Sequence, residues 1–296
     1  MTTAIPKRRR WIAALLSLLL SPFMAMLYVN RGRLALLYFA IGLAVTVAAA
    51  AFLPLGWHGW GWIWLAQLPI NLVGAVHSAK IAGNWQDGFL RWYAHWYSLV
   101  GIYLLFPAAA LFIRTFLYQP FSIPTTAMSP AINPGDYVFA EKFAYKSSAP
   151  RRGDVIIFRV PSMGNDEYVK RIVGLPGDRV QMKNGILYVN GNAAPQRPIG
   201  RFPLDCGSLG PCATSELEET LPGGVRHPIL DIVPNGALDN TPEFRVGTGS
   251  YFVVGDNRDN SNDSRGDLGP VPRDLIVGRV RWKFVAHGHW TWQTVQ

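Results

Sequence analysis

The sequence predicts an α-helical membrane domain over residues 1–119, followed by a mainly β domain over residues 120–296. Long apolar stretches are confined to the first part, and short alternating strand patterns to the second. The first part also holds nine of the 28 basic residues but one of the 19 acidic residues, so the second part is almost neutral. Because a nucleic-acid-binding domain needs a basic face of its own, we exclude nucleic acid as a partner.

Three apolar stretches in the first part each approach the roughly 20 residues that cross a bilayer. They are Leu34 to Leu55, Trp60 to Ala79 and Tyr97 to Tyr118. An earlier stretch, Trp11 to Val29, is interrupted by Ser21-Pro22, so we expect a re-entrant or kinked helix, with a full span as the alternative. Its basic start imitates a secretory signal peptide, but no small-x-small cleavage site follows, so we expect it to be retained.

Basic residues in short loops favour the cytoplasmic side of a membrane. The turn from Asn30 to Arg33 and the loop from Lys80 to Trp96 carry such residues, whereas the turn from Gly56 to Gly59 carries none. We therefore expect the last span to deliver the second part of the chain to the outside.

The β pattern after Pro120 consists of short apolar runs separated by turn residues. The expected strands are Tyr137 to Ala140, Val155 to Val160, Arg179 to Met182, Ile186 to Val189, Tyr251 to Val254 and Leu275 to Phe284. Asn184-Gly185 predicts a tight hairpin, and the Pro-Gly pairs before Asp136 and Asp178 predict type II turns. Residues 193–249 are rich in Pro, Gly and polar residues and are interpreted as an insertion with few strands.

The two cysteines, Cys206 and Cys212, lie close together on a Gly- and Pro-containing segment. In a domain expected outside the cell this pair favours a small structural disulfide, with two free thiols as the alternative. A metal site needs more ligands than this pair supplies, so we predict no metal and no cofactor.

Lys170 is the candidate general base, because it lies in an otherwise apolar strand pattern. A lysine can accept a proton only if desolvation or a nearby positive charge lowers its pKa. Tyr168, Val169 and Ile172 supply apolar surroundings, and we expect Arg171 to supply the like charge. For an isolated lysine, a solvated strand position would be the more common interpretation.

Three separated blocks resemble bacterial type I signal peptidases, also called leader peptidases. They are Phe-Ser-Ile-Pro-Thr-Thr-Ala-Met-Ser-Pro-Ala-Ile-Asn-Pro-Gly-Asp from Phe121, Tyr-Val-Lys-Arg-Ile-Val-Gly-Leu-Pro-Gly-Asp from Tyr168 and Gly-Asp-Asn-Arg-Asp-Asn-Ser-Asn-Asp-Ser-Arg from Gly255. The resemblance implies an antiparallel, barrel-like catalytic domain that removes signal peptides from exported preproteins with a Ser/Lys dyad. It also implies a multi-pass protein of the bacterial plasma membrane, with the catalytic domain on the periplasmic or extracellular side. The implied partners are signal peptides and membrane lipids, with the export translocon as a further candidate.

The resemblance assigns roles to individual residues. Lys170 is carried onto the general base, Ser261 onto the hydroxyl that orients it, and Thr125 onto the oxyanion donor that acts with the main-chain N–H of residue 127. The supporting polar residues are Arg171, Asp256, Arg258, Asp263 and Arg265. A calcium loop is disfavoured for the last block, because no Glu closes it at EF-hand spacing and Arg258 interrupts its carboxylates.

The nucleophilic serine of the family falls on Ala127, within a segment that resembles the strand carrying that serine. A methyl group cannot attack a carbonyl, and the nearby Ser129 has the wrong register for Lys170 and precedes Pro130. Because Lys170, Ser261 and Thr125 are all retained, we favour an engineered Ser-to-Ala form. A natural, noncatalytic signal-peptide-binding homologue is the alternative.

The resemblance also implies two shallow apolar pockets for the small substrate residues before the cleaved bond. The positions that match their lining are Phe121, Ile123, Met128, Ile132, Val138, Ile157, Tyr168 and Val169. Each methylene is worth only ~1 to 3 kcal/mol of discrimination, so we expect the bilayer to contribute to substrate selection.

Overall fold

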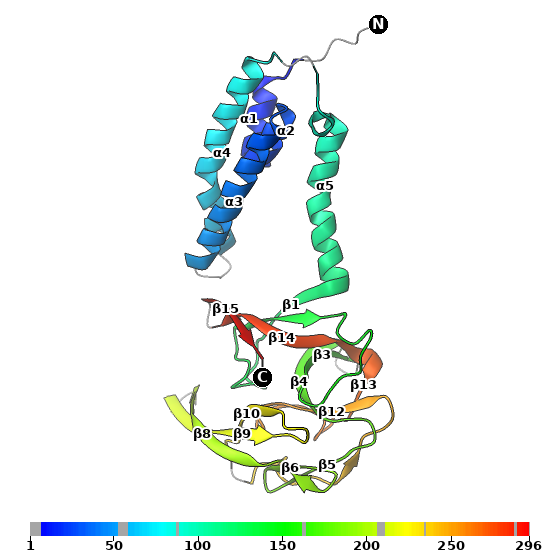
Figure 1. Ribbon diagram of the computed structural model, residues 1–296. Helices are drawn as coiled ribbons and strands as arrows, with labels where there is room; N and C mark the ends of the chain where they lie inside the picture. Colours follow the sequence, from blue (N-terminus) through cyan, green and yellow to red (C-terminus); the bar gives the residue numbers. More distant parts are fainter. Residues whose placement is uncertain are drawn as a thin grey trace. The chain divides into compact units, whose positions relative to one another are not determined.

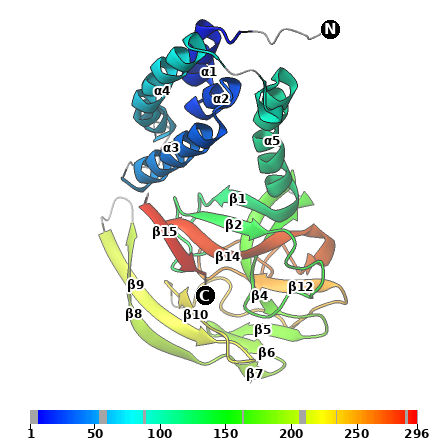
Figure 2. The same cartoon turned by 45° about the horizontal axis from the view of Figure 1, so that its top comes forward.

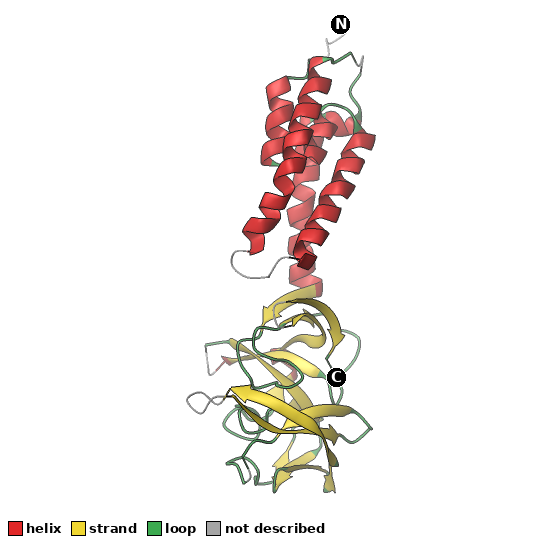
Figure 3. Cartoon of the chain, turned by 90° about the vertical axis from the view of Figure 1, so that its left-hand side faces the viewer, coloured by secondary structure: helices red, strands yellow, loops and turns green. Residues whose placement is uncertain are grey.

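The computed structural model describes residues 7–52, 59–86, 89–161, 164–205, 211–233, 235–286 and 289–295. The chain divides into two compact units. The first comprises residues 1–112 with residues 288–290, and the second comprises residues 113–287 with residues 291–296. Figure 3 shows that the long helices belong to the first unit and that strands make up most of the second.

The helical unit is built from α1 (Arg10–Leu19), α2 (Pro22–Tyr28), α3 (Gly32–Phe52), α4 (Gly59–Gly83), the short η1 (Trp92–Ala94) and α5 (Trp96–Phe112) (Figure 1). The predicted break in the first apolar stretch is confirmed. Ser21 caps α2 by accepting a hydrogen bond from the Met24 N–H, and Pro22 occupies the first helical turn, where no N–H is needed. Whether this broken segment re-enters or spans the membrane stays a prediction.

Among the described helices, two are long and apolar enough to cross a membrane, Gly32–Ala49 and Trp96–Leu117. The second of these includes the π-helical turn η2 (Ile113–Leu117) that follows α5. The middle of α4 carries Gln67, Pro69 and Asn71, which lower its hydropathy. The span expected over α4 therefore stays a prediction.

The second unit is a mainly antiparallel β domain, as predicted. Its largest sheet has the order β1-β2-β14-β3-β4-β12-β13, with β15 paired to β14, and two smaller sheets have the orders β11-β5-β6-β7 and β10-β9-β8. The strands of the large sheet are β1 (Tyr118–Ser122), β2 (Tyr137–Glu141), β3 (Val155–Val160), β4 (Asp166–Gly174), β12 (Ser250–Val254), β13 (Val271–Pro272), β14 (Ile276–Ala286) and β15 (His289–Thr294). The short helix η5 (Arg273–Leu275) joins β13 to β14.

The local turn predictions in this unit are confirmed. Asn184 and Gly185 have φ angles of 49° and 76° and join β5 (Arg179–Lys183) to β6 (Ile186–Val189), which β7 (Asn192–Ala193) extends. Gly135 and Gly177 also have positive φ, as the two expected turns require.

The prediction of few strands over residues 193–249 is wrong. This segment contains the ten-residue strands β8 (Gln196–Asp205) and β9 (Pro211–Thr220), together with β10 (Arg226–Leu230) and β11 (Phe244–Arg245). Figure 2 shows β8 and β9 running side by side as a long ribbon. Pro198, Gly200 and Pro203 obscure the strand pattern in the sequence. β8 is an edge strand, so a proline whose nitrogen faces away from β9 interrupts no hydrogen bond of the ladder.

Candidate functional site

Lys170 lies on β4, between β3 and β12 in the large sheet. It is 4% exposed, and its Nζ lies 5.5 Å from the centroid of the Tyr168 ring. Burial lowers the pKa of Lys170 to about 8, and the nearby Arg265 acts in the same direction, while Asp263 and Asp256 oppose the shift. A lysine with this pKa is neutral in about a tenth of molecules at pH 7, far more often than an ordinary lysine.

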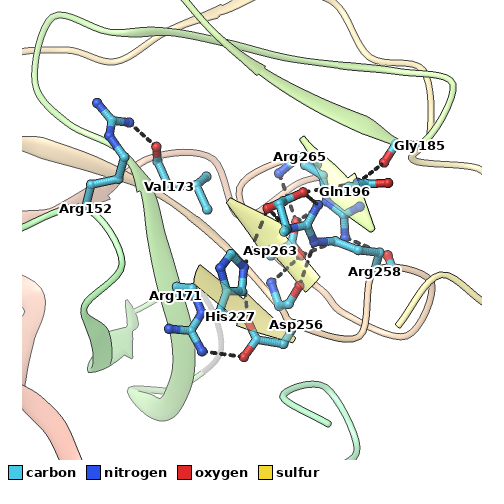
Figure 4. A network of polar contacts seen from close by, with 12 residues as sticks. Arg152, Arg171, Val173, Gly185, Gln196, His227, Asp256, Arg258, Asp263 and Arg265 are labelled. Atoms are coloured by element: carbon cyan, nitrogen blue, oxygen red, sulfur yellow. Dashed lines mark hydrogen bonds and ion pairs between the residues drawn. The ribbon is translucent and has the colours of Figure 1, made fainter. Parts of the chain in front are cut away.

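The expectation that Arg171 supplies the like charge beside Lys170 is wrong. Neighbouring residues of a strand point to opposite faces, and the Arg171 guanidinium is directed at Asp256, which it contacts through Nε and Nη2 at 2.7 Å each. Arg171 also donates to the Gly153 carbonyl at 2.9 Å. Figure 4 shows this pairing. Arg265, which comes from the third sequence block, takes the place that the sequence suggested for Arg171.

Residue 127 lies in a turn rather than in the expected strand. β1 ends at Ser122, and residues 125–130 form turns that include a hydrogen bond from the Ser129 N–H to the Thr126 carbonyl at 3.0 Å. The loop after β12 holds this turn. Asn257 donates through its main-chain N–H to the Ala127 carbonyl and through its side chain to the Thr126 carbonyl, both at 3.2 Å.

Gly255 is the point at which the three blocks meet. A Cβ built on this glycine would lie 2.2 Å from the Ser261 Oγ and 2.6 Å from the Ala127 carbonyl oxygen, so a side chain has no room here. Val254, the last residue of β12, pairs with Arg171 in the antiparallel ladder, so Gly255 directly follows the strand that neighbours the one carrying Lys170. The fold therefore brings Ser261 and the main chain of residue 127 to Gly255, with Thr125 exposed beside residue 127. Lys170 lies on the neighbouring strand, close enough to Asp263 and Asp256 for these carboxylates to act on its pKa.

The supporting polar residues form buried pairs around this point. Asp263 accepts from Arg265 through both carboxylate oxygens at 2.9 Å and from the Gly255 N–H at 3.0 Å. Burial would raise the pKa of Asp263, but these hydrogen bonds outweigh burial and lower it below its usual value. Arg258 forms its ion pair with Glu219, at 3.1 and 2.5 Å, and among the described residues no ion pair joins it to an acidic residue of its own block.

Several residues at this site were missed by sequence reasoning. Glu219 and His227, from β9 and β10, are 0% and 1% exposed and belong to the cluster around Asp256. Asn260 donates to the Thr126 Oγ1 at 2.7 Å. The run Glu-Leu-Glu-Glu before Thr220 resembles a solvated polar strand, so the sequence carries no local signal that its last glutamate is buried.

The eight predicted pocket residues separate into buried and accessible ones. Seven of them belong to one apolar cluster, and Tyr168 packs against a second cluster. Five are less than 5% exposed and serve as core: Ile123, Met128, Ile132, Val138 and Ile157. Phe121, Tyr168 and Val169 are partly exposed, and their contact with a substrate stays a prediction.

Cys206 lies outside the described residues, as does the side chain of Cys212, so the disulfide stays a prediction. Asp231, Asp239 and Asp259, none of them a predicted site residue, place their carboxylate oxygens within 4.8 Å of one another. Asp259 accepts from the Ile232 and Val233 N–H groups, and Asp239 accepts from the Gly236 N–H, so these carboxylates hold loops.

Comparison with known proteins gives concordant matches. Residues 94–285 match the family model described as signal peptidase, peptidase S26. The signal peptidase I of Rickettsia akari is 33% identical over 199 residues, which cover 58% of this chain and 73% of that protein. The signal peptidase I of Rickettsia typhi is 34% identical over 199 residues, with 58% and 74% covered. A crystal structure of a signal peptidase I from Enterococcus faecalis aligns at 25% identity and a TM-score of 0.28, covering 45% of this chain and 97% of that one.

Proposed function

The chain belongs to the signal peptidase family, peptidase S26, and from this premise we propose that it carries the Ser/Lys centre of a membrane-bound serine endopeptidase. Its substrates are the signal peptides of exported preproteins. Position 127 holds the nucleophile, Lys170 is the general base, and Ser261 orients the lysine amine. With alanine at position 127, the chain binds signal peptides without cleaving them.

The observation that carries this proposal is the convergence at Gly255. Residue 127 and Ser261 both approach this glycine so closely that no Cβ fits, and Lys170 lies on the adjacent strand β4, near enough to Asp263 and Asp256 for their charges to act on its pKa. The amine of Lys170 is buried, which lowers its pKa to about 8. At pH 8 such a lysine is about half neutral, whereas an ordinary lysine is neutral in well under about 1% of molecules.

The reaction follows from this arrangement once residue 127 is a serine. The neutral amine of Lys170 takes the hydroxyl proton as the serine oxygen attacks the scissile carbonyl carbon. The main-chain N–H of residue 127 and the Thr125 hydroxyl stabilise the oxyanion. The lysine ammonium then protonates the departing amine, and the released chain leaves an acyl-enzyme. Water attacks the ester, with Lys170 again taking and returning the proton, and frees the serine.

Membrane attachment is the second part of the proposal. The two long apolar helices and α4, which crosses back between them, anchor the chain in the plasma membrane, and the basic loops before α3 and α5 lie on the cytoplasmic side. The β unit then works on the periplasmic or extracellular side, where export delivers preproteins. Membrane lipids and the export translocon are the proposed neighbours, and Cys206 and Cys212 would meet oxidising conditions there.

The test is to replace alanine by serine in the full-length chain. Ala127→Ser is expected to cleave a preprotein at a small-x-small site, and Lys170→Ala in that background is expected to abolish cleavage. Ser129→Ala serves as the matched control, because Ser129 has no part in the proposed mechanism, and cleavage should persist. Product masses from the serine variant identify the cleaved bond.

The second candidate function is a noncatalytic signal-peptide-binding protein, which the alanine at position 127 favours. If the folded Ala127→Ser chain binds preprotein but leaves it intact over a wide pH range, this second function replaces the first. If it neither binds nor cleaves preprotein, both proposals are wrong.

A further inference from the structure

We propose that Glu219 is a positioning residue for the Lys170 centre, and that the inserted sheet β10-β9-β8 acts on catalysis through it. This inference rests on the proposed function and concerns a residue that lies outside all three family-like blocks. Glu219 is fully buried on β9, 39 positions before its partner Arg258. Its role is to hold the loop that carries Gly255, Asp256 and Ser261.

The Arg258 guanidinium connects the Glu219 carboxylate to the main chain of Gly255. Both terminal nitrogens of Arg258 donate to Glu219, at 3.1 and 2.5 Å, and its Nε donates to the Gly255 carbonyl at 3.2 Å. Glu219 also accepts from Gln196 on β8 at 3.2 Å, so two strands of the inserted sheet contribute. Gly255 is thus linked through the Arg258 side chain to the Glu219 carboxylate, which the sheet β10-β9-β8 holds in place.

Main-chain hydrogen bonds join the same two parts. The Leu230 N–H at the end of β10 donates to the Asp256 carbonyl, and the Arg258 N–H donates to the Leu230 carbonyl, both at 2.9 Å. The loop after β12 therefore pairs with β10 before it reaches Ser261. The inserted sheet and the Glu219 pair together fix both the backbone and the side chains of this loop.

His227 occupies the space between the two carboxylates of this cluster. Its Nε2 lies 3.5 Å from the Glu219 Oε2 and 3.8 Å from the Asp256 Oδ1, and the ring is 1% exposed. Burial, together with the charges of Arg171 and Arg258, lowers the pKa of His227 well below its ordinary value. The two arginines balance Glu219 and Asp256, so a neutral histidine keeps the buried cluster without net charge.

The arrangement indicates positioning rather than simple stabilisation. A buried ion pair adds little stability compared with apolar residues of the same shape, because desolvation offsets the attraction between the charges. Such a pair fixes geometry instead, and here it fixes the glycine against which Ser261 and residue 127 pack. A shift of about 1 Å at a reacting centre can lower the rate by about 10²-fold.

The experiment compares two adjacent glutamates of β9 in full-length Ala127→Ser protein. Glu219→Gln removes the buried charge. Glu218→Gln makes the same change at the preceding position, where the side chain pairs with the exposed Arg197. We expect Glu219→Gln to lower kcat at least about tenfold with KM within about twofold of the parent value. Glu218→Gln should leave both constants unchanged, and Glu219→Asp, which keeps the carboxylate, should recover part of kcat.

A double variant separates positioning from folding. Glu219→Gln leaves the Arg258 charge buried without its partner, whereas Glu219→Gln with Arg258→Met removes both charges and should unfold near the temperature of the parent. We expect the double variant to keep the low kcat. A folded double variant with the kcat of the parent would overturn the proposal, as would an equal loss in Glu218→Gln.

A readout without catalysis distinguishes this inference from the proposed function. The titration of the Lys170 amine can be followed by NMR in the Ala127 chain with labelled lysine, with Lys170→Ala used to assign the signal. We expect Glu219→Gln to move the midpoint upward, because a displaced loop lets water reach the amine. An unchanged midpoint would count against positioning even if the serine variant is active. A shifted midpoint in an inert serine variant would instead refute the endopeptidase alone.

Discussion

Two buried lysines in the same sheet differ in how their charge is compensated. Lys283 on β14 lies 3.1 Å from Asp136, and both side chains are almost fully buried. Lys170 on β4 is equally buried, but within the part of the chain that the structure describes it forms no ion pair. The two lysines therefore differ in one respect: Lys283 has a carboxylate within ion-pair distance, and Lys170 has none among the described residues.

This comparison distinguishes Lys283, a structural lysine held in an ion pair, from Lys170, the proposed base. Asp136 also accepts from the Asn133 N–H, so the Lys283 pair holds the turn that ends the segment carrying residue 127. At Lys170 the carboxylates of Asp263 and Asp256 are engaged by Arg265 and Arg171 instead. The amine of Lys170 is thereby desolvated with only partial compensation from these carboxylates, so burial lowers its pKa, which suits the proposed base.

The largest expected effect concerns the rate. In the Ala127→Ser background, Lys170→Met should reduce cleavage by at least about 10³-fold, because the serine loses its base. Lys283→Met should retain measurable cleavage in the fraction of molecules that is folded. Initial rates with a preprotein substrate check both values. Comparable loss in the two variants, both folded, would remove the distinction between the lysines.

The second effect concerns stability. Lys283→Met should lower the free energy of unfolding of the β unit by about 3 to 5 kcal/mol, because it leaves the Asp136 carboxylate buried without its partner. Asp136→Asn added to Lys283→Met should restore most of this loss. Denaturant unfolding followed by tryptophan fluorescence measures both variants, and equal stability of the single and double variants would show that the pair is not coupled.

The third effect is a gain in stability, opposite to the loss expected for Lys283→Met. Because burial lowers the pKa of Lys170 to about 8, the unfolded chain binds one more proton than the folded chain between pH 8 and about pH 10.5. Stability should rise with pH across this window, and Lys170→Met should stabilise the protein by roughly 2 to 3 kcal/mol below pH 8. Cleavage by the serine variant should likewise rise with pH to a midpoint near 8. A stability and a cleavage rate that do not change with pH across this window would contradict a lowered pKa of Lys170.

The smallest effect tests carboxylates that lack a direct counter-charge. Burial raises the pKa of Asp231 to about 6, with further contributions from Asp239 and Asp259. The folded state then binds the extra proton between pH 4 and pH 6, so stability falls as pH rises through this range. Asp231→Asn should stabilise the protein at pH 7 by less than about 1 kcal/mol, since water screens this half-exposed group. Thermal unfolding at pH 5 and pH 7 gives the comparison.

The sequence predicted what depends on neighbouring residues. Short apolar runs bounded by turn residues identified the strands around Ile157 and Val253, and the positive φ required by Asn184-Gly185 identified a hairpin. The blocks around Ala127, Lys170 and Ser261 were recognisable because each is contiguous. These features are set by backbone sterics and by side chains close in the chain.

Only the tertiary structure decided which charges meet. Arg171 pairs with Asp256 across 85 positions and Arg258 with Glu219 across 39, and nothing local to either residue selects its partner. The strands of residues 193–249 were hidden because their pattern is polar and broken by proline, so pairing between strands rather than alternation defines them. Burial and the exclusion of water follow from these long-range pairings. The sequence therefore identified Lys170 as the proposed base, while the low pKa of its amine exists only in the folded state.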